Sequence, residues 1–223
     1  MNFSSSLLVL HSSARITRSI TRRLAARFTE RWLAAHPGGD VVQRDAGTLP
    51  PSPVGEAWIA AAYSPPADRT PEMTAALAES EMLIREIEQA DVIVMGVPMY
   101  NFGMPAQMKA YLEQIVRSGR TFGFTGDPAN PYRPLLRSKP VIAIISTGAT
   151  GYEPGGPGAA LDFLEPQLRA VLALVGLTDL TLVRVSGAGT HDAHFEASLA
   201  AAEAAVDAIV KKLAGAESAA DAG

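Results

Sequence analysis

Five short strand-like runs, most of them dense in valine, leucine and isoleucine, alternate with longer amphipathic segments along this chain of 223 residues. The runs occupy residues 7–10, 40–45, 92–97, 141–146 and 180–185. The intervening segments repeat apolar residues at helical spacing, and the first of them carries Ile20, Leu24, Phe28 and Trp32 at four-residue steps. Strands that are apolar throughout are buried on both faces. The alternation therefore predicts an α/β fold with a parallel sheet and helices on both of its faces.

The third run leads directly into the most informative stretch of the sequence. An apolar strand stops at Pro98, a loop of Met99-Tyr100-Asn101-Phe102 follows, and a helix restarts near Pro105, a residue type that suits the first helical turn. Ligands of open α/β sheets bind at the carboxyl ends of the strands, where this loop must lie. Two aromatic side chains and an amide there predict contact with a flat, ring-shaped ligand.

The net charge, the lack of cysteine and the lengths of the apolar runs limit the kinds of partner and site that we expect for this chain. A net charge of -4 gives no reason to expect nucleic acid or an anionic membrane as a partner. The absence of cysteine excludes disulfides, thiolate metal sites and cysteine nucleophiles. The apolar start at residues 7–10 is too short for a signal peptide core, and no run approaches the roughly 20 residues of a membrane helix. We therefore expect a cytoplasmic protein with a single domain over residues 1–214 and a disordered tail over 215–223.

The loop after the first strand is a candidate phosphate site. It offers the hydroxyls of Ser12, Ser13, Thr17 and Ser19 and the charges of Arg15 and Arg18, next to a helix amino terminus with unpaired N–H groups. The competing interpretation, of about equal weight, is a capping serine with solvated arginines. The loop matches neither G-x-G-x-x-G nor G-x-x-x-x-G-K-[ST], which disfavours a Rossmann dinucleotide site and a nucleotide P-loop.

A third loop follows the fourth strand as Ser146-Thr147-Gly148-Ala149, in which the glycine permits close approach of a ligand to the backbone. Taken alone, an ordinary turn explains it equally well. Parallel topology brings this loop, the 12–19 loop and the 98–102 loop to one edge of the sheet. Together they predict a mononucleotide with a flat head group.

Other features of the sequence indicate its function less strongly. His191-x-x-His194 resembles half of a metal site, yet no carboxylate pattern completes it, so a helix cap is the simpler interpretation and we expect no metal. No G-x-S-x-G supports a hydrolase. Residues 46–71 contain six prolines and read as an irregular excursion with a short helical turn near residues 56–62. Residues 71–89 and 192–213 read as helices, and residues 121–132 as a loop that could close into a small hairpin.

Four segments of the chain resemble the FMN-dependent NADH:azoreductase and quinone reductase family, whose fold is flavodoxin-like. They are Leu10-His11-Ser12-Ser13 with Thr17-Arg18-Ser19, the stretch from Ala90 through Pro98-Met99-Tyr100-Asn101-Phe102, Ser146-Thr147-Gly148-Ala149, and Leu174 to Asp179. The resemblance spans nearly the whole chain, and Pro-Met-Tyr-Asn-Phe is its most specific part. It implies a five-stranded parallel sheet in the order 2-1-3-4-5.

The resemblance also implies roles for individual residues. Ser12, Thr17, Arg18 and Ser19 would hold the FMN phosphate, and Pro98 and Met99 would line the ribityl chain. Tyr100, Asn101 and Phe102 would cradle the isoalloxazine, while Ser146, Thr147, Gly148 and Ala149 would approach its pyrimidine end. The usual Ser-Arg-Gly-Gly of the family is Ser-Thr-Gly-Ala here, which bears on the flavin potential and the substrate preference, and His11 stands where a lysine is common.

The implied activity is two-electron, ping-pong reduction of quinones or azo compounds by NADH or NADPH, with FMN tightly bound and no protein side chain required as acid or base. The family further implies a homodimer with its sites at the interface, to which residues 46–71 could contribute. Two alternatives stay open at this point. One is an electron carrier of the flavodoxin type, although carriers are usually shorter and more acidic; the other is a scaffold that has lost its cofactor, against which the intact 98–102 stretch argues.

Overall fold

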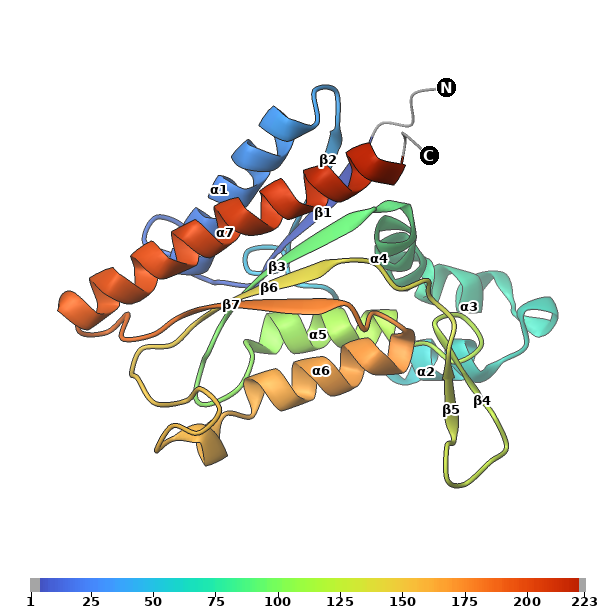
Figure 1. Ribbon diagram of the computed structural model, residues 1–223. Coiled ribbons are helices and arrows are strands. Elements are labelled where there is room, and N and C mark those ends of the chain that lie inside the picture. The colour runs from blue at the N-terminus through green and yellow to red at the C-terminus, as the bar shows by residue number, and fades with distance from the viewer. Residues whose placement is uncertain (1–4, 221–223) are drawn as a thin grey trace.

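The computed structural model describes residues 5–220 and contains one parallel sheet with strand order β2-β1-β3-β6-β7 (Figure 1). Its strands are β1 (Ser6–His11), β2 (Asp40–Asp45), β3 (Val92–Pro98), β6 (Val141–Ser146) and β7 (Leu180–Val185). Since β6 and β7 are the fourth and fifth strands of this sheet in chain order, the predicted order 2-1-3-4-5 is confirmed. The order in which strands are added reverses at β1 and β3: β2 lies on one side of β1, and all later strands lie on the other. Ligands of such sheets bind at this switch point.

Helices cover both faces of the sheet (Figure 1). Helices α1 (Ile20–Ala35) and α7 (Ala193–Ala220) lie on one face, and α4 (Ala78–Gln89), α5 (Ala106–Ile115) and α6 (Leu164–Val175) lie on the other. Alternate side chains of each strand feed the two cores, as β1 shows: Leu7 and Val9 pack with α1 and α7, and Leu8 and Leu10 pack with α4 to α6. This double burial explains why the inner strands β1, β3 and β6 are almost entirely apolar.

The first face is closed by α1 and α7 lying side by side. Phe28 and Trp32 of α1 are fully buried in its core. Above that core, Arg27 of α1 forms a two-pronged ion pair with Asp207 of α7, with N–O distances of 2.9 and 2.6 Å. The amphipathic spacing in α1 thus supplies both a buried apolar stripe and a polar margin.

The excursion after β2 contains α2 (Glu56–Tyr63) and a single 3-10 turn at Pro66–Asp68, close to the helical turn that the sequence predicts. The sequence predicts one continuous helix over residues 71–89, but the structure divides it into α3 (Pro71–Ala76) and α4. The break falls at Leu77, whose amide is shared between the carbonyls of Met73 and Thr74 at 3.3 Å each. Apolar spacing continues through the break, so periodicity alone does not reveal it.

A short antiparallel hairpin of β4 (Phe122–Phe124) and β5 (Tyr132–Pro134) projects beyond the sheet (Figure 1). Its base is tied to α4 by Glu81, which forms ion pairs with Arg117 and Arg120. Burial by itself would raise the pKa of Glu81, but the hydrogen bonds from Arg120 and Arg117 outweigh burial and hold that pKa at about 2. The carboxylate is therefore ionised throughout the neutral range.

Two further observations concern the ends and surface of the chain. The sequence predicts that the last helix ends near Leu213, whereas α7 continues to Ala220, because the segment is rich in alanine, the residue with the highest helix propensity. Residues 221–223 of the predicted disordered tail lie outside the described residues. Within residues 5–220, no helix has both the length and the apolar character that a membrane span requires.

Candidate functional site

Four loops meet around a cavity of about 510 Å³ at the carboxyl edge of the sheet. The three predicted loops all contribute, and the fourth is the loop between β7 and α7. The lining residues are Ser13, Arg15, Arg18, Ser19, Ile20, Pro98, Met99, Tyr100, Ser146, Thr147, Gly148, Ala188, Gly189 and His191. The convergence predicted from topology is therefore present in the structure.

The amino terminus of α1 forms one end of this cavity. Ser19 is the N-cap, and its hydroxyl accepts a hydrogen bond from the amide of Arg22 at 3.3 Å. The amides of Ile20 and Thr21, at the first two helical positions, have no acceptor among the described residues. With the helix dipole, they make this end suited to an anionic group.

The two serines that follow β1 differ in what their hydroxyl groups do. Ser12 is fully buried, and its Oγ donates to the carbonyl of Gly96 at 2.8 Å, so its hydroxyl hydrogen is already used inside the sheet edge. Ser13 instead lines the cavity. Thr17, also predicted to contact phosphate, is exposed and does not line the cavity. Neighbouring serines in the sequence gave no signal for this difference.

The loop after β3 closes as a two-residue turn. The amide of Tyr100 donates to the carbonyl of Gly103 at 2.9 Å, and the amide of Gly103 donates back at 3.1 Å. Asn101 and Phe102 between them have φ angles of +47° and +70°, the pattern of a type I′ turn. Left-handed backbone is costly for a residue with a side chain, and such strain gathers at functional sites.

Neighbouring loops hold this turn. The Tyr100 hydroxyl accepts a hydrogen bond from the amide of Ala14 in the first loop at 3.3 Å. The ring of Phe102 meets the ring of Tyr152 edge-on, with centroids 6.2 Å apart. Asn101 and Phe102 do not line the cavity itself; they form the tip of the turn beside it.

The loops after β6 and β7 bind each other through their backbones. The amide of Ala188 donates to the carbonyl of Thr147 at 3.0 Å, and that of Gly189 donates to Gly148 at 2.9 Å. The Thr147 hydroxyl donates to the carbonyl of Ala149 at 2.7 Å. These bonds engage the carbonyls of the 146–149 loop, while the amides of Gly148 and Ala149 have no acceptor among the described residues. The sequence reasoning missed the β7–α7 loop, in which the two glycines at 187 and 189 were the available signal.

The charges that line the cavity have one sign. Arg15 and Arg18 contribute guanidinium groups, and no aspartate or glutamate is among the lining residues. Its volume falls in the range of about 300–1,000 Å³ that is usual for sites of small molecules and cofactors. A positive end with free amides, an aromatic turn and a glycine loop in one cavity fit a phosphorylated ligand with a planar head.

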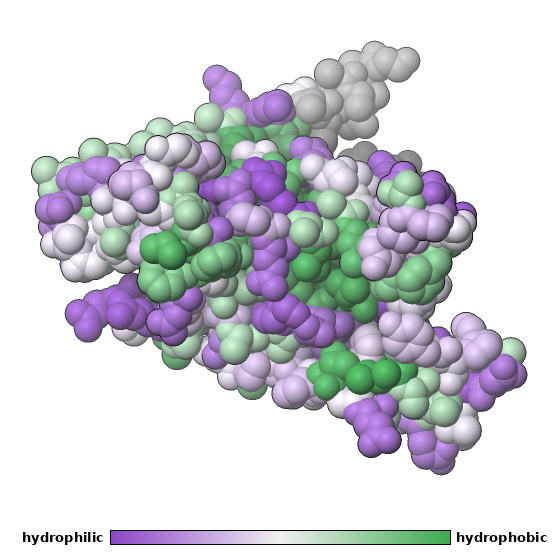
Figure 2. All heavy atoms as spheres, turned by 90° about the horizontal axis from the view of Figure 1, so that it is seen from below, coloured by the Kyte–Doolittle hydropathy of each residue, from purple (hydrophilic) through white to green (hydrophobic). Residues whose placement is uncertain are grey.

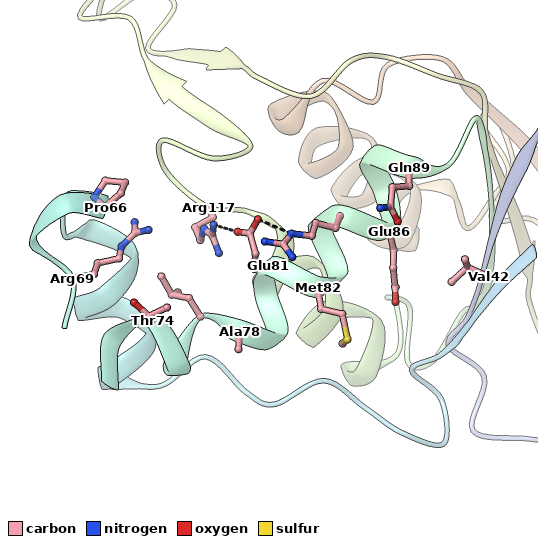
Figure 3. A pocket seen from close by; sticks show the side chains of 12 residues that line it. Val42, Pro66, Arg69, Thr74, Ala78, Glu81, Met82, Glu86, Gln89 and Arg117 are labelled. Atoms are coloured by element: carbon pink, nitrogen blue, oxygen red, sulfur yellow. Dashed lines mark hydrogen bonds and ion pairs between the residues drawn. The ribbon is translucent and has the colours of Figure 1, made fainter. Parts of the chain in front are cut away.

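A larger cavity, of about 820 Å³, lies away from these loops, along α3 and α4 and beside Val42 of β2 (Figure 3). Both of its carboxylates are paired: Glu81 lies between Arg117 and Arg85, which also line the cavity, and Glu86 binds Arg44 of β2. None of the four loops reaches it. Its size alone does not make it the better site for an anionic ligand.

The two histidines at the start of α7 contact other side chains. The Nε2 of His194 lies 2.9 Å from the hydroxyl of Ser186, and His191 packs edge-on against Phe195. No group of three or more histidine, aspartate or glutamate side chains suited to a metal ion occurs in the part of the chain that the structure describes.

Comparison with known proteins agrees with this geometry. A family model described as flavodoxin-like fold matches residues 5–210. The FMN-dependent NADH:quinone oxidoreductase of Opitutus terrae is 48% identical over 94% of this chain and 99% of its own length. The FMN-dependent NAD(P)H:quinone oxidoreductase 1 of Pseudomonas aeruginosa is 40% identical over 89% of this chain and 95% of its own length.

A solved structure shares the fold. The FMN-dependent NADH-azoreductase of Bacillus anthracis, solved in complex with FMN, covers 94% of this chain and 100% of its own length with a TM-score of 0.81 at 18% identity. The fold and the site define a protein of the flavodoxin-like class. Within that class, the chain belongs to the FMN-dependent NADH:quinone oxidoreductase family, and the predicted resemblance is confirmed.

Proposed function

We propose that this protein is an FMN-dependent NAD(P)H oxidoreductase that reduces quinones and azo compounds. The observation that carries the proposal is the convergence, in one cavity of about 510 Å³, of a positive helix terminus, an aromatic turn and a glycine loop. Relatives that are 48% and 40% identical are named for FMN and for quinone reduction. The azo substrates come from a structural neighbour whose identity is only 18%, so they rest on the resemblance of sequence motifs as well.

Each loop has a distinct part in holding the cofactor. The phosphate would bind at the amino terminus of α1, to the amides of Ile20 and Thr21 and the side chains of Ser19 and Arg18, with Ser13 in place of Ser12. Pro98 and Met99 would line the ribityl chain. The turn from Tyr100 to Phe102 would support one side of the ring system.

The 146–149 loop would face the pyrimidine end of the ring. The amides of Gly148 and Ala149 can stabilise negative charge there, because they have no acceptor among the described residues. The carbonyls of Thr147 and Gly148 are bonded to the β7–α7 loop and are not available to repel that charge. Bound FMN supplies the redox chemistry, taking two electrons and a proton from a reduced nicotinamide and passing them to an acceptor in turn. The protein's own task is to orient the ring and leave one of its faces open to both substrates.

The test is anaerobic stopped-flow reduction of the FMN-loaded protein. With excess NADH or NADPH, the oxidised-flavin absorbance should disappear within the turnover time, and a quinone mixed in afterwards should restore it. The second candidate, an electron carrier of the flavodoxin type, predicts slow or absent reduction by both nicotinamides. A protein that cannot be loaded with FMN would contradict both functions.

We further propose a cytoplasmic homodimer with sites at the subunit interface. Large apolar side chains are exposed along the excursion after β2, including Leu49 at 77% and Tyr63 at 68%. Tyr63 is also part of an apolar groove of about 430 Å³ between α2, α5 and α6, which Trp58 and Phe122 line as well. Figure 2, which views the molecule from the α5 and α6 side, shows hydrophobic residues exposed there beside hydrophilic ones. Analytical ultracentrifugation should give twice the 23.4 kDa of the chain, and a monomer at micromolar concentration would contradict the proposal.

A further inference from the structure

Residues 12–19, which connect β1 to α1, are called the phosphate loop below. The guanidinium of Arg22 lies behind this loop and is not among the groups that line the cavity. Its Nε donates to the carbonyl of Arg15 at 3.0 Å, and its Nη2 donates to the carbonyl of Ser13 at 2.7 Å. The side chain is only 14% exposed. One side chain therefore holds two carbonyl groups of the loop that connects β1 to α1.

Asp45, at the end of β2, fixes the orientation of this guanidinium. Its two carboxylate oxygens accept hydrogen bonds from Nη2 and Nη1 of Arg22 at 2.6 and 2.8 Å. The Oδ1 atom also accepts the amide of Thr48 at 3.2 Å. The hydrogen bond from Arg22 is the main reason that the pKa of Asp45 is lowered to about 2, so this carboxylate is fully ionised at neutral pH.

The backbone after β2 supports the loop from the same side. The amide of Gly47 donates to the carbonyl of His11 at 3.0 Å. A Cβ atom at Gly47 would lie 2.2 Å from the carbonyl oxygen of Ser13 and 2.9 Å from Nη2 of Arg22. The packing is thus closed around the carbonyl of Ser13, and only a glycine fits.

We infer that Arg22 is a positioning residue for the cofactor phosphate, an inference that rests on the proposed function. By binding the carbonyls of Ser13 and Arg15, it keeps their negative dipole ends behind the loop. The hydroxyl of Ser13, whose oxygen accepts the amide of Arg15 at 3.2 Å, then keeps its hydrogen free to donate into the cavity and to an anion bound there. Arg22 acts through the loop and Asp45 acts through Arg22.

The phosphate itself provides a test that separates positioning from general structural support. Riboflavin has the same ring and ribityl chain as FMN but no phosphate. In Arg22→Gln, we expect the Kd for FMN to rise about tenfold or more, the size of one lost hydrogen bond to a charged group. The Kd for riboflavin should change by less than about twofold from the wild-type value. Both constants are measured by quenching of flavin fluorescence.

Arg27→Gln is the matched control. Arg27 lies on the same helix and makes a comparable two-pronged ion pair, with Asp207, but it contacts no part of the phosphate loop. Both Kd values should stay at the wild-type level in this variant. Arg22→Lys, which keeps the charge but not the forked geometry, should recover part of the FMN affinity.

The results of these titrations distinguish a failure of the inference from a failure of the proposed function. Equal loss of affinity for FMN and riboflavin in Arg22→Gln, or no loss for either, would overturn the inference. Should that variant fail to fold, Asp45→Asn provides the same comparison, because it removes the charge that orients Arg22 while keeping one acceptor oxygen. A wild-type protein that binds neither flavin would contradict the proposed function instead, so the two failures are distinguishable.

Discussion

The backbone amide of Phe163 donates a hydrogen bond of 3.0 Å to the carbonyl of Phe102. This bond joins the tip of the turn after β3 to the segment that precedes α6, although the two residues lie far apart in the sequence. Together with the paired bonds between Tyr100 and Gly103, it fixes a turn whose two central residues are both left-handed. The surrounding loops therefore hold a backbone shape that its own residues disfavour.

The turn predicts contrasting effects for two substitutions of Asn101. Valine is β-branched and disfavours a positive φ, so Asn101→Val should lower the free energy of unfolding by about 1–2 kcal/mol and weaken FMN binding. Asn101→Gly should leave stability within about 1 kcal/mol of wild type, because glycine accepts this conformation freely. Urea unfolding of the apoprotein and flavin titration measure the two effects.

Asn130→Val is the control for that experiment, since Asn130 is exposed in the hairpin and is not left-handed. It should leave the flavin affinity unchanged. Equal effects of valine at positions 101 and 130 would show that the turn has no special part in the site.

The neighbouring serines after β1 should differ in what their loss affects. Ser12→Ala removes the donor to the buried carbonyl of Gly96, so we expect a loss of about 1–2 kcal/mol in stability. Ser13→Ala removes only the acceptor of the Arg15 amide, at 3.2 Å, so it should cost less stability than Ser12→Ala but weaken FMN more than riboflavin, because Ser13 lines the cavity. The reverse pattern would return the phosphate contact to Ser12, as the sequence resemblance implies.

The ion pairs of Glu81 predict a stability effect without a cofactor effect. In Glu81→Gln, the side chain of Arg117, only 4% exposed, would keep its charge without a carboxylate partner. Glu81→Gln should therefore lower the free energy of unfolding, measured with urea, by about 3 kcal/mol. Glu113→Gln, in an exposed pair with Lys109, should lower it by less than about 1 kcal/mol. FMN affinity should be unchanged in both. A cofactor defect in Glu81→Gln would mean that the hairpin base communicates with the site.

The ion pair of Asp45 also predicts a dependence of stability on pH. Because its pKa is lowered from 3.8 to about 2 in the folded protein, the pair stabilises the fold fully above about pH 5 and loses this contribution as pH falls toward 2. The difference in unfolding free energy between wild type and Asp45→Asn should therefore be constant from pH 7 to about pH 5 and shrink below pH 4. Urea unfolding at pH 7, 5, 4 and 3 measures it, and a difference that grows on acidification would contradict the assignment.

The sequence predicts the layers of this fold well because burial determines the pattern of apolar residues within each element. Residues 7–10 are all apolar because their strand lies between two helical layers, and the spacing of apolar residues in α1 follows from its contact with the sheet. The three site loops are likewise predictable, since parallel strands place their carboxyl ends at one edge.

What escaped prediction depends on contacts between distant segments. Whether Ser12 or Ser13 faces the cavity is decided by the carbonyl of Gly96 on the neighbouring strand. Arg22 reads from the sequence as one of several arginines on a helix surface, and only the position of Asp45 reveals its role. The break at Leu77 is invisible for a related reason, because the apolar period does not change there.

The central claim is that FMN binds at the carboxyl edge of the sheet with its phosphate at the start of α1. A crystal structure of the protein grown with FMN tests it most directly. The account predicts the phosphate within hydrogen-bond distance of Ser13, Ser19 and the amides of Ile20 and Thr21, with the ring beside the turn at residues 100–103. Flavin density in the groove along α3 and α4, with the carboxyl edge of the sheet empty, would contradict it.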